Sequence, residues 1–302
     1  MSRLPAWLRT LAECNARGEP AVLVGVERTE GSAPRRAGAR MVFSAAAQAD
    51  TIGGGHLEWK AAEVARGMLS AAAPQDDGPA SRLVKRFPLG PSLGQCCGGV
   101  VHLSFELKRP GAALSAWIAA EAKAHAASRP HVVLFGAGHV GQALIRQLAP
   151  LDCEVTWADE REALFPAGLS AQIRVEATDL LESVVDEAPA GSDFLVMTHE
   201  HSLDLALSQG ILERMRERGD VAWFGLIGSA TKRAQFERRL AERGIGPALL
   251  AAMTCPIGIR GKEPELIALA VAAQLAGLWE ERAARAADEF SSQTRKQLAA
   301  GN

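Results

Sequence analysis

The chain has 302 residues, of which 48% are hydrophobic and 23% charged, so it is long enough for about two domains with buried cores. Its formal net charge of -2 and the lack of a basic stripe give no reason to expect nucleic acid or a membrane surface as a partner. The opening residues lack the apolar core of a signal peptide, and no stretch of about 18 apolar residues follows. We therefore expect a cytoplasmic protein.

Residues 1–110 are predicted to form a mixed α+β domain. A helix over residues 5–16 stops at Gly18, and a second helix begins after Gly53, Gly54 and Gly55, where apolar residues recur at helical spacing. Short apolar runs bounded by turn-forming residues predict strands around these helices. The predicted strands cover residues 21–26, 40–43, 83–87 and 99–106.

An Ala-rich stretch over residues 112–128 is predicted to form a helix. It ends at Arg129-Pro130, because proline disfavours the helical conformation at the residue before it. The composition on the two sides of this stretch differs. We therefore take residues 111–130 as a helical linker between two domains.

Residues 131–290 alternate apolar strands with helices, which is the pattern of a parallel sheet covered by helices. The strands are expected at residues 131–135, 154–159, 174–177, 193–198 and 221–228, and the helices begin near residues 139, 202, 231 and 264. The last helix is expected to end near Glu281, and residues 291–302 to form a flexible tail. The predicted fold class is therefore α/β, with an N-terminal mixed α+β domain followed by a C-terminal Rossmann-like domain.

The segment GAGHVG directly follows an apolar strand and opens a helix, and Asp159 ends the next strand. In dinucleotide-binding proteins the first glycine permits a tight turn, the second lets backbone N–H groups approach a phosphate, and the third allows close packing of helix and strand. Gly136, Gly138 and Gly141 are therefore candidate cofactor-binding residues, and Asp159 is a candidate acceptor for a ribose hydroxyl. The same turn can hold another phosphate or serve the fold alone.

Two further turns follow strands at the edge where open α/β sheets bind ligands. His199 lies in THEHSLD, which differs from an HxHxDH metal motif because Asp204 falls one residue late and no histidine follows it. His199 is a candidate ligand contact; the alternative is a hydrogen-bonded histidine beside a solvated Asp204. Gly228 and Ser229 open a helix whose N–H groups can meet an anion. Its alternative is a capped helix with a solvated basic face.

Two turns of the first domain are also candidates for binding. Gly53, Gly54 and Gly55 at a helix start can meet an anion or form only a tight turn. Arg35, on the turn GSAPRRAG, has a guanidinium suited to phosphate or carboxylate; the ordinary alternative is a solvated charged turn.

The loop LGQCCGG contains the adjacent residues Cys96 and Cys97. The five cysteines of the chain are odd in number and lack paired CxxC spacing, which argues against a disulfide scaffold and a structural zinc site. Adjacent thiols in a loop bounded by glycines can contact a soft metal. Both are therefore candidate cofactor contacts.

Several segments occur in the order found in xanthine dehydrogenase accessory proteins of the XdhC family, which the chain resembles over nearly its whole length. They are GSAPRRAGARMVF, IGGGHLEW, LGQCCGG, FGAGHVGQAL, MTHEHSLDLAL, GLIGSATKR and CPIGIRGKEPELIALAVAAQLA. The ending GIRGKEPELIA is more similar to the xanthine dehydrogenase branch than to the carbon monoxide dehydrogenase relatives.

The resemblance implies an XdhC/CoxI-type domain over residues 1–110 and a Rossmann domain after the linker. It implies a chaperone of purine catabolism, not an enzyme, that binds the molybdopterin form of the molybdenum cofactor as cargo, supports its sulfuration and inserts it into xanthine dehydrogenase. The implied partners are the apo-dehydrogenase, a cysteine desulfurase or other sulfur donor, and a second copy in a homodimer. By resemblance Cys97, before the paired glycines, is the molybdenum contact and Cys96 its neighbour.

Two other functions are compatible with the same residues. One is an NAD(P)-dependent oxidoreductase that uses Gly136 to Gly141 and Asp159, with His199 as acid or base. The other is a scaffold for assembling dehydrogenase subunits. Bound molybdenum and pterin would distinguish the chaperone from both.

Overall fold

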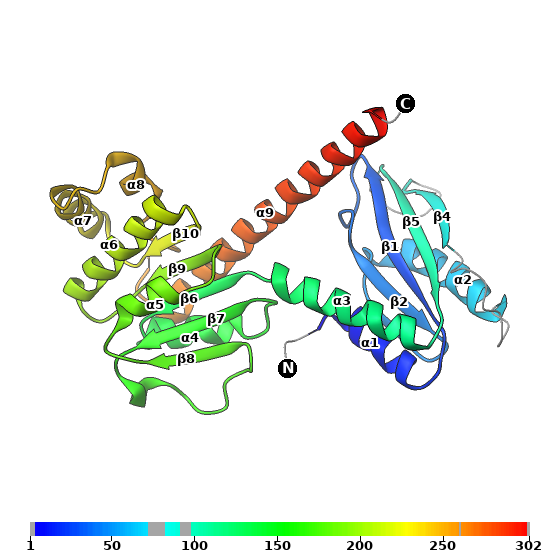
Figure 1. Ribbon diagram of the computed structural model, residues 1–302, viewed down its shortest axis with the longest axis horizontal. Helices are drawn as coiled ribbons and strands as arrows, with labels where there is room; N and C mark the ends of the chain where they lie inside the picture. Colours follow the sequence, from blue (N-terminus) through cyan, green and yellow to red (C-terminus); the bar gives the residue numbers. More distant parts are fainter. Residues whose placement is uncertain (1–3, 72–81, 91–97, 260, 301–302) are drawn as a thin grey trace. The chain divides into compact units, whose positions relative to one another are not determined.

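The computed structural model describes residues 4–71, 82–90, 98–259 and 261–300. The chain divides into two compact units, Leu4–Ser128 and a second unit that begins at Arg129 (Figure 1). Each unit has its own sheet and its own hydrophobic core. The two units are therefore described separately.

The first unit contains a five-stranded antiparallel sheet with the order β3-β2-β1-β5-β4. Its strands are β1 (Ala21–Glu30), β2 (Arg40–Ser44), β3 (Gln48–Asp50), β4 (Arg82–Pro88) and β5 (Val100–Lys108). The four predicted strands are confirmed. Strand β3 was not predicted, because its 3 residues are too few to show an apolar alternation.

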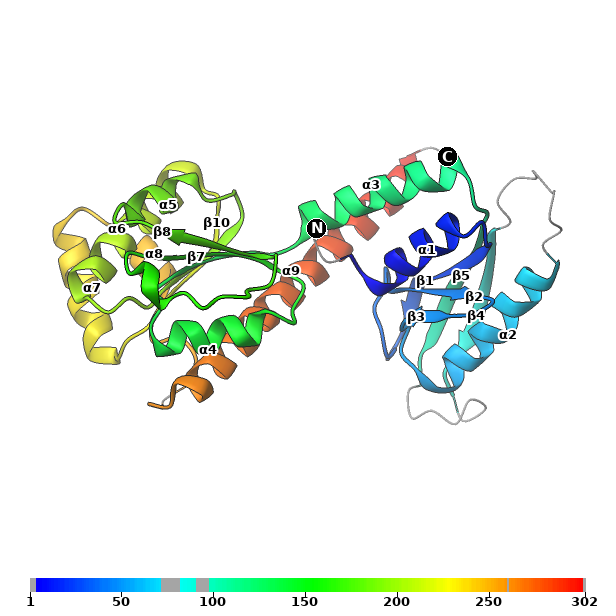
Figure 2. The ribbon, with the colours of Figure 1, turned by 90° about the horizontal axis from the view of Figure 1, so that it is seen from below.

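Helices cover both faces of this sheet (Figure 2). They are α1 (Ala6–Ala16), α2 (Gly55–Ala71) and α3 (Ala112–Ser128). Alternate residues of a strand point to opposite faces, so Val22 and Val24 of β1 pack in the cluster that contains α2. Ala21 and Leu23 pack in the cluster that contains α1 and α3. Both faces of β1 are thus apolar over residues 21–24, which is why helices cover the sheet on both sides.

The second unit contains a six-stranded parallel sheet with the order β11-β10-β9-β6-β7-β8. Its strands are β6 (His131–Phe135), β7 (Glu154–Asp159), β8 (Ile173–Ala177), β9 (Ser192–Val196), β10 (Val221–Leu226) and β11 (Met253–Thr254). This is the doubly wound Rossmann order, in which the winding reverses between β6 and β9. The predicted fold class is therefore confirmed, and the reversal marks where a ligand is expected.

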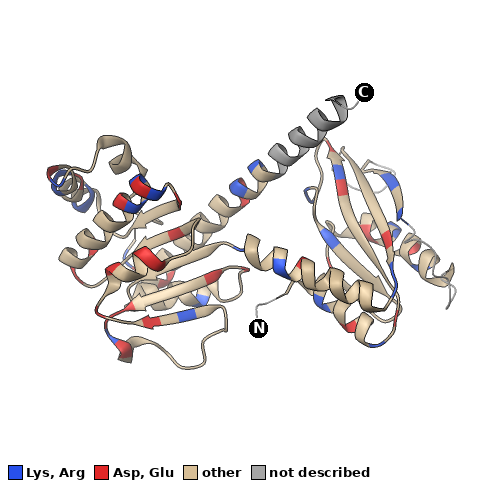
Figure 3. Ribbon diagram, in the orientation of Figure 1, with Lys and Arg blue, Asp and Glu red and all other residues tan. Residues whose placement is uncertain are grey.

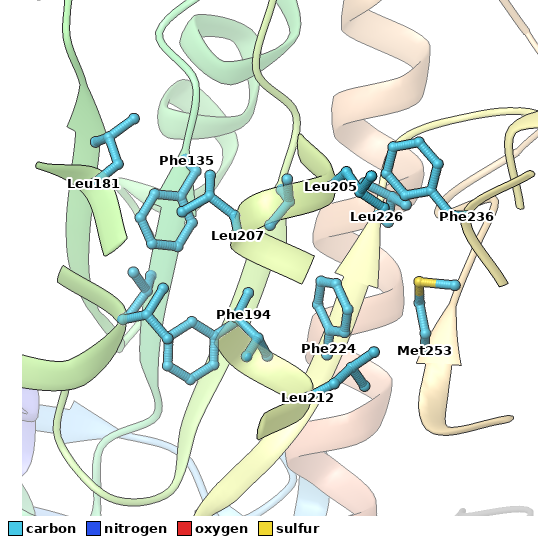
Figure 4. Packing of buried hydrophobic residues seen from close by; sticks show 14 of the residues in the cluster. Phe135, Leu181, Phe194, Leu205, Leu207, Leu212, Phe224, Leu226, Phe236 and Met253 are labelled. Carbon is cyan, nitrogen blue, oxygen red and sulfur yellow. The ribbon is translucent and has the colours of Figure 1, made fainter. Parts of the chain in front are cut away.

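Two layers of helices cover this sheet (Figure 2). One face packs against α4 (His139–Leu148) and α9 (Pro264–Ala300). The other face packs against α5 (Leu181–Glu187), α6 (His201–Arg218), α7 (Ala230–Glu242) and α8 (Pro247–Ala252). Figure 4 shows Phe135, Phe194 and Phe224, from three neighbouring strands, in the core beneath the second layer. Burial of each such side chain contributes about 1.5–3 kcal/mol.

The final helix is longer than predicted. Helix α9 continues to Ala300, so residues 291–300 of the expected flexible tail belong to it. Asp193, at the start of β9, is fully buried and accepts hydrogen bonds from two side chains of α9, Trp279 Nε1 at 2.8 Å and Arg282 Nη1 at 3.1 Å. These hydrogen bonds link the middle of α9 to strand β9 of the sheet.

Acidic and basic residues are interspersed over the strands and helices of both units (Figure 3). This distribution agrees with the near-neutral net charge and provides no long stripe of one sign among the described residues. Within that part of the chain, no helix combines the length and the apolar character that crossing a membrane requires.

Candidate functional site

A cavity of about 520 Å³ lies at the carboxyl ends of the central strands in the second unit. Its walls come from the segments that follow β6, β7, β9 and β10, together with the start of α9. The lining residues are Ala137, Gly138, His139, Val140, Gly141, Gln142, Arg161, Leu164, Met197, Thr198, His199, Ile227 and Pro264. The cavity therefore lies at the reversal between β6 and β9, where open α/β sheets bind ligands.

The three glycines of the GAGHVG turn have different roles. A Cβ on Gly136 would lie 2.3 Å from the carbonyl oxygen of Met197, and one on Gly141 would lie 2.1 Å from the carbonyl oxygen of Gly136. Both glycines are therefore required by the packing of the chain itself. A Cβ on Gly138 would meet nothing within 4 Å. The space in front of Gly138 is open to the cavity, which is what a ligand approaching the backbone needs.

Helix α4 begins directly after Gly138. The N–H groups of a first helical turn have no acceptor within the helix and carry the positive end of its dipole. His139, Val140 and Gly141 bring that turn to the cavity wall. A helix N-terminus at this place suits an anion, so the geometry is compatible with the predicted phosphate contact.

Asp159 is held differently from the expected ribose contact. Its carboxylate is buried and accepts four N–H donors: the Ala137 amide at 2.6 Å, the Arg161 amide at 2.9 Å, and Arg161 Nε and Nη2 at 2.8 Å each. A carboxylate has about four acceptor sites. Contrary to the expectation from sequence, Asp159 therefore has no capacity left for a ribose hydroxyl.

The electrostatics of this pair follow from its geometry. Burial by itself would raise the pKa of Asp159, but the hydrogen bonds from Arg161 and from the Ala137 amide hold that pKa below its ordinary value. The bond to Asp159 in turn raises the pKa of Arg161. Both groups are therefore charged at neutral pH. The arginine side chain stays 35% exposed on the cavity wall, against 3% for the aspartate, so the group offered to a ligand is a cation.

His199 also lines the cavity, in the segment that follows β9. Its Nε2 is 3.5 Å from Oε1 of Glu160, and both side chains are 41% exposed. The neighbouring Thr198 is turned inward, because its amide and hydroxyl donate to Asp204 at 3.0 and 2.7 Å. His199 is thus accessible to a ligand in the cavity.

Asp204 and Lys232 are not solvated, contrary to the alternatives considered from sequence. Asp204 is buried, and Lys232 Nζ donates to its Oδ2 at 2.5 Å and to the carbonyl oxygen of Ile227 at 2.8 Å. This pair joins the ends of β9 and β10 behind the cavity. Ser229 caps α7, since its Oγ accepts from the Lys232 amide at 3.2 Å, and neither Gly228 nor Ser229 lines the cavity.

In the first unit, the Gly53 to Gly55 turn is satisfied from within. Oε1 of Glu58, in the first turn of α2, accepts from the Ile52 amide at 3.0 Å and the Gly54 amide at 2.8 Å, and it also accepts from the Thr51 hydroxyl. The Gly53 amide donates to Thr51 Oγ1 at 3.1 Å. A carboxylate of the chain thus occupies the place predicted for an external anion, which favours the tight-turn alternative.

The glycine contacts show that three turns of the first unit lie together. A Cβ on Gly53 would be 2.4 Å from Cγ of Pro34, and one on Gly99 would be 2.2 Å from the carbonyl oxygen of Ser32. The GSAPRRAG turn therefore contacts both the Gly53 turn and the start of β5. Arg35 is exposed on this turn.

Cys96 and Cys97 lie outside the described residues, so their predicted role stays a prediction. Three other cysteines, Cys14, Cys153 and Cys255, are buried. Burial raises the pKa of Cys153 to about 12, which makes that thiol inert at neutral pH. No group of three or more potential metal-binding His, Cys, Asp or Glu side chains occurs within residues 4–71, 82–90, 98–259 and 261–300.

Of the residues predicted from the sequence, Gly138, Gly141 and His199 line the cavity, whereas Gly136 packs against the carbonyl oxygen of Met197 and does not line it. The sequence analysis missed Arg161. An arginine shortly after the second strand of a Rossmann unit can accommodate a phosphate on the ribose. The segment Asp159-Glu160-Arg161 contains that signal. Only Asp159, the acidic residue at the strand end and the more familiar ribose contact, was considered.

The fold and the cavity define a class of protein: a Rossmann-type ligand-binding unit joined to an antiparallel α+β unit. Two family models match this chain and identify the family within that class. The XdhC Rossmann domain matches residues 132–275, and the XdhC and CoxI family model matches residues 14–81. The chain belongs to the XdhC family.

Two relatives place the chain further. The uncharacterized protein YqeB of Escherichia coli is 26% identical over 259 residues, which are 85% of this chain and 43% of that protein. The chain thus spans less than half the length of this curated relative. A crystal structure from Bacillus halodurans, named as that of a xanthine dehydrogenase, covers 92% of this chain and 96% of its own at 16% identity, with a TM-score of 0.72. At this identity the second likeness shows a shared fold.

Proposed function

We propose that the chain is an accessory protein in the maturation of xanthine dehydrogenase and does not turn over a substrate of its own. In this proposal it binds the molybdenum cofactor as cargo, protects it, supports its sulfuration and inserts it into the apo-dehydrogenase. Membership of the XdhC family supports the general role. The partners are the apo-dehydrogenase and a cysteine desulfurase or other sulfur donor.

The cavity of the second unit is the observation that carries the proposal. Molybdopterin has a phosphate, a dithiolene and a polar pterin, so its site needs an anion-binding turn and room for a ring system. The cavity combines the first turn of α4 with about 520 Å³ of space, within the range of about 300–1,000 Å³ usual for small-molecule sites. Leu164, Met197 and Ile227 add apolar wall against which a ring can pack.

A nicotinamide-dependent oxidoreductase is the second candidate function. The Rossmann strand order and the position of the cavity favour it. The saturation of Asp159 argues against it, because an unphosphorylated dinucleotide would lose its usual acceptor at the ribose.

The test is to purify the chain from cells that make the cofactor and to measure molybdenum and pterin per chain. The matched control is the same protein from cells that cannot make the pterin. We expect bound molybdenum and pterin in the first preparation only, and faster activation of apo-xanthine dehydrogenase by it. A protein that is always empty, fails to activate the dehydrogenase and binds NAD⁺ tightly would support the oxidoreductase instead.

A further inference from the structure

The end of β7 is the place where this cavity departs from an ordinary dinucleotide site. In Rossmann proteins an acidic residue here accepts hydrogen bonds from the adenosine ribose. Asp159 occupies that place, but it is buried and already accepts from Ala137 and from three donors of Arg161. A neutral diol at this point would meet a guanidinium instead of a free carboxylate.

Arg161 is held in position by Asp159 but keeps N–H donors that are not used in that contact. Its Nε and Nη2 both donate to Asp159, and this two-point contact sets the plane of the guanidinium at the cavity wall. A guanidinium has five N–H donors, so both donors of Nη1 remain for a ligand; among the described residues no acceptor is assigned to them. Such a preset donor loses little freedom when a ligand binds.

Arg161 and the first turn of α4 line one and the same cavity. Each attracts negative charge, one as a fixed cation and the other through free N–H groups. Two such groups in one cavity suit a ligand with a phosphate ester better than a ligand with hydroxyl groups alone. The Asp159 carboxylate, which would oppose an anion, is 3% exposed. The neighbouring Glu160 is 41% exposed, but it lies 3.5 Å from Nε2 of His199 and is not among the residues that line the cavity.

We propose that Arg161 is the specificity-determining residue of this cavity and that it selects a ligand whose phosphate ester reaches the end of β7. The inference rests on the proposed function only in using the same cavity. The phosphate can belong to a nucleotide phosphorylated on its ribose or to the phosphorylated side chain of the pterin. In either case Arg161, not Asp159, contacts the ligand.

The first arm of the test needs no variant. Titration calorimetry on the full chain with NADP⁺ and with NAD⁺ compares two probes that differ by one ribose phosphate. If the phosphate is that of a nucleotide, we expect NADP⁺ to bind at least tenfold more tightly than NAD⁺. Measurable binding of both probes with equal affinity would overturn the inference.

The second arm changes the arginine. Arg161→Gln removes the cation, and Arg161→Lys keeps the charge and one bond to Asp159 but lacks the planar fork. The lysine variant guards against loss of the fold, because Asp159 keeps a charged partner, and thermal unfolding is measured first on both. The control is Arg238→Gln, since Arg238 is a 73% exposed cation on α7 that pairs with Glu242.

For the nucleotide source, both Arg161 variants should lose the preference for NADP⁺, and NAD⁺ binding should not weaken, because Asp159 regains acceptor capacity when the guanidinium is removed. For the pterin source, the parent binds neither nucleotide, and pterin retained from cofactor-making cells should fall at least fivefold in both Arg161 variants. The control should match the parent in each case. Full retention by both variants would overturn the inference.

The two proposals fail separately. A parent that prefers NADP⁺ through Arg161 but carries no molybdenum would uphold this inference and refute the proposed function. A parent that carries molybdenum and activates the dehydrogenase regardless of residue 161 would do the reverse.

Discussion

Substitution of Gly138 separates a ligand-binding glycine from a structural one. A Cβ at this position meets no atom within 4 Å, and Gly138 has φ -69° and ψ -174°, an extended conformation open to any residue. Glycine is a better N-cap than alanine or valine, so Gly138→Ala and Gly138→Val should each cost about 1 kcal/mol of folding free energy. That corresponds to a decrease in Tm of about 2–4 °C for a domain of this size.

Gly141→Ala is the matched comparison. Its Cβ would lie 2.1 Å from the carbonyl oxygen of Gly136, and this backbone atom cannot move without opening the contact between α4 and β6. We expect a loss of about 3 kcal/mol or more, as for other substitutions that force a core apart. Two glycines of the same turn should therefore differ by several degrees in Tm.

Among variants that fold, ligand binding should be reduced more by substitution of Gly138 than by substitution of Gly141, the reverse of the order for stability. A side chain on Gly138 occupies the space through which a phosphate reaches the N–H groups of α4. We expect Gly138→Val to retain at least tenfold less pterin than the parent, equivalent to about 1.4 kcal/mol, with Gly138→Ala intermediate. Thermal unfolding and pterin analysis on the same preparations provide both readings. Normal retention by Gly138→Val, or a Tm as low as that of Gly141→Ala, would refute the reasoning.

Three further predictions concern a thiol, a partly buried histidine and a buried carboxylate. Cys97→Ala should leave a folded protein that retains much less molybdenum and activates the dehydrogenase poorly, with Cys96→Ala near the parent; equal retention by both variants would make the loop structural. Burial, with the nearby charge of Arg174, lowers the pKa of His131 to about 4. The unfolded chain therefore binds a proton near pH 6.5 that the folded chain refuses, and up to about 3 kcal/mol of stability should be lost between pH 6.5 and 4. Urea unfolding at several pH values checks this, and a His131→Asn variant should show a weaker dependence. Asp193→Ala should cost about 3 kcal/mol or more, because it strips a buried acceptor from Trp279 and Arg282. Urea unfolding should show a far smaller loss, about 1 kcal/mol, for Trp279→Phe.

Features with a local cause could be predicted from the sequence. The alternation of apolar strands with helices is set by neighbouring residues, and it predicted the Rossmann sheet, the helix over residues 112–128 and the GAGHVG turn. That helix packs on the sheet of the first unit, which the sequence did not predict. Elements too short to show a repeating pattern were missed. Strand β11 has 2 residues and helix α5 has 7. The end of α9 was missed for another reason, since residues 282–300 are rich in the helix formers Ala and Arg but lack a regular apolar stripe.

The chemistry of the site depended on contacts between distant parts of the chain. Asp159 and Arg161 are neighbours in sequence, yet the carboxylate is saturated only because the Ala137 amide, 22 residues away, also donates to it. Lys232 reaches Asp204 across 28 residues, and this contact makes an ion pair of two charges for which solvation was one alternative from the sequence. A motif specifies which groups are present, but whether a group is free for a ligand depends on its other partners. Those partners are set by the packing of the strand ends, which only the tertiary structure decides.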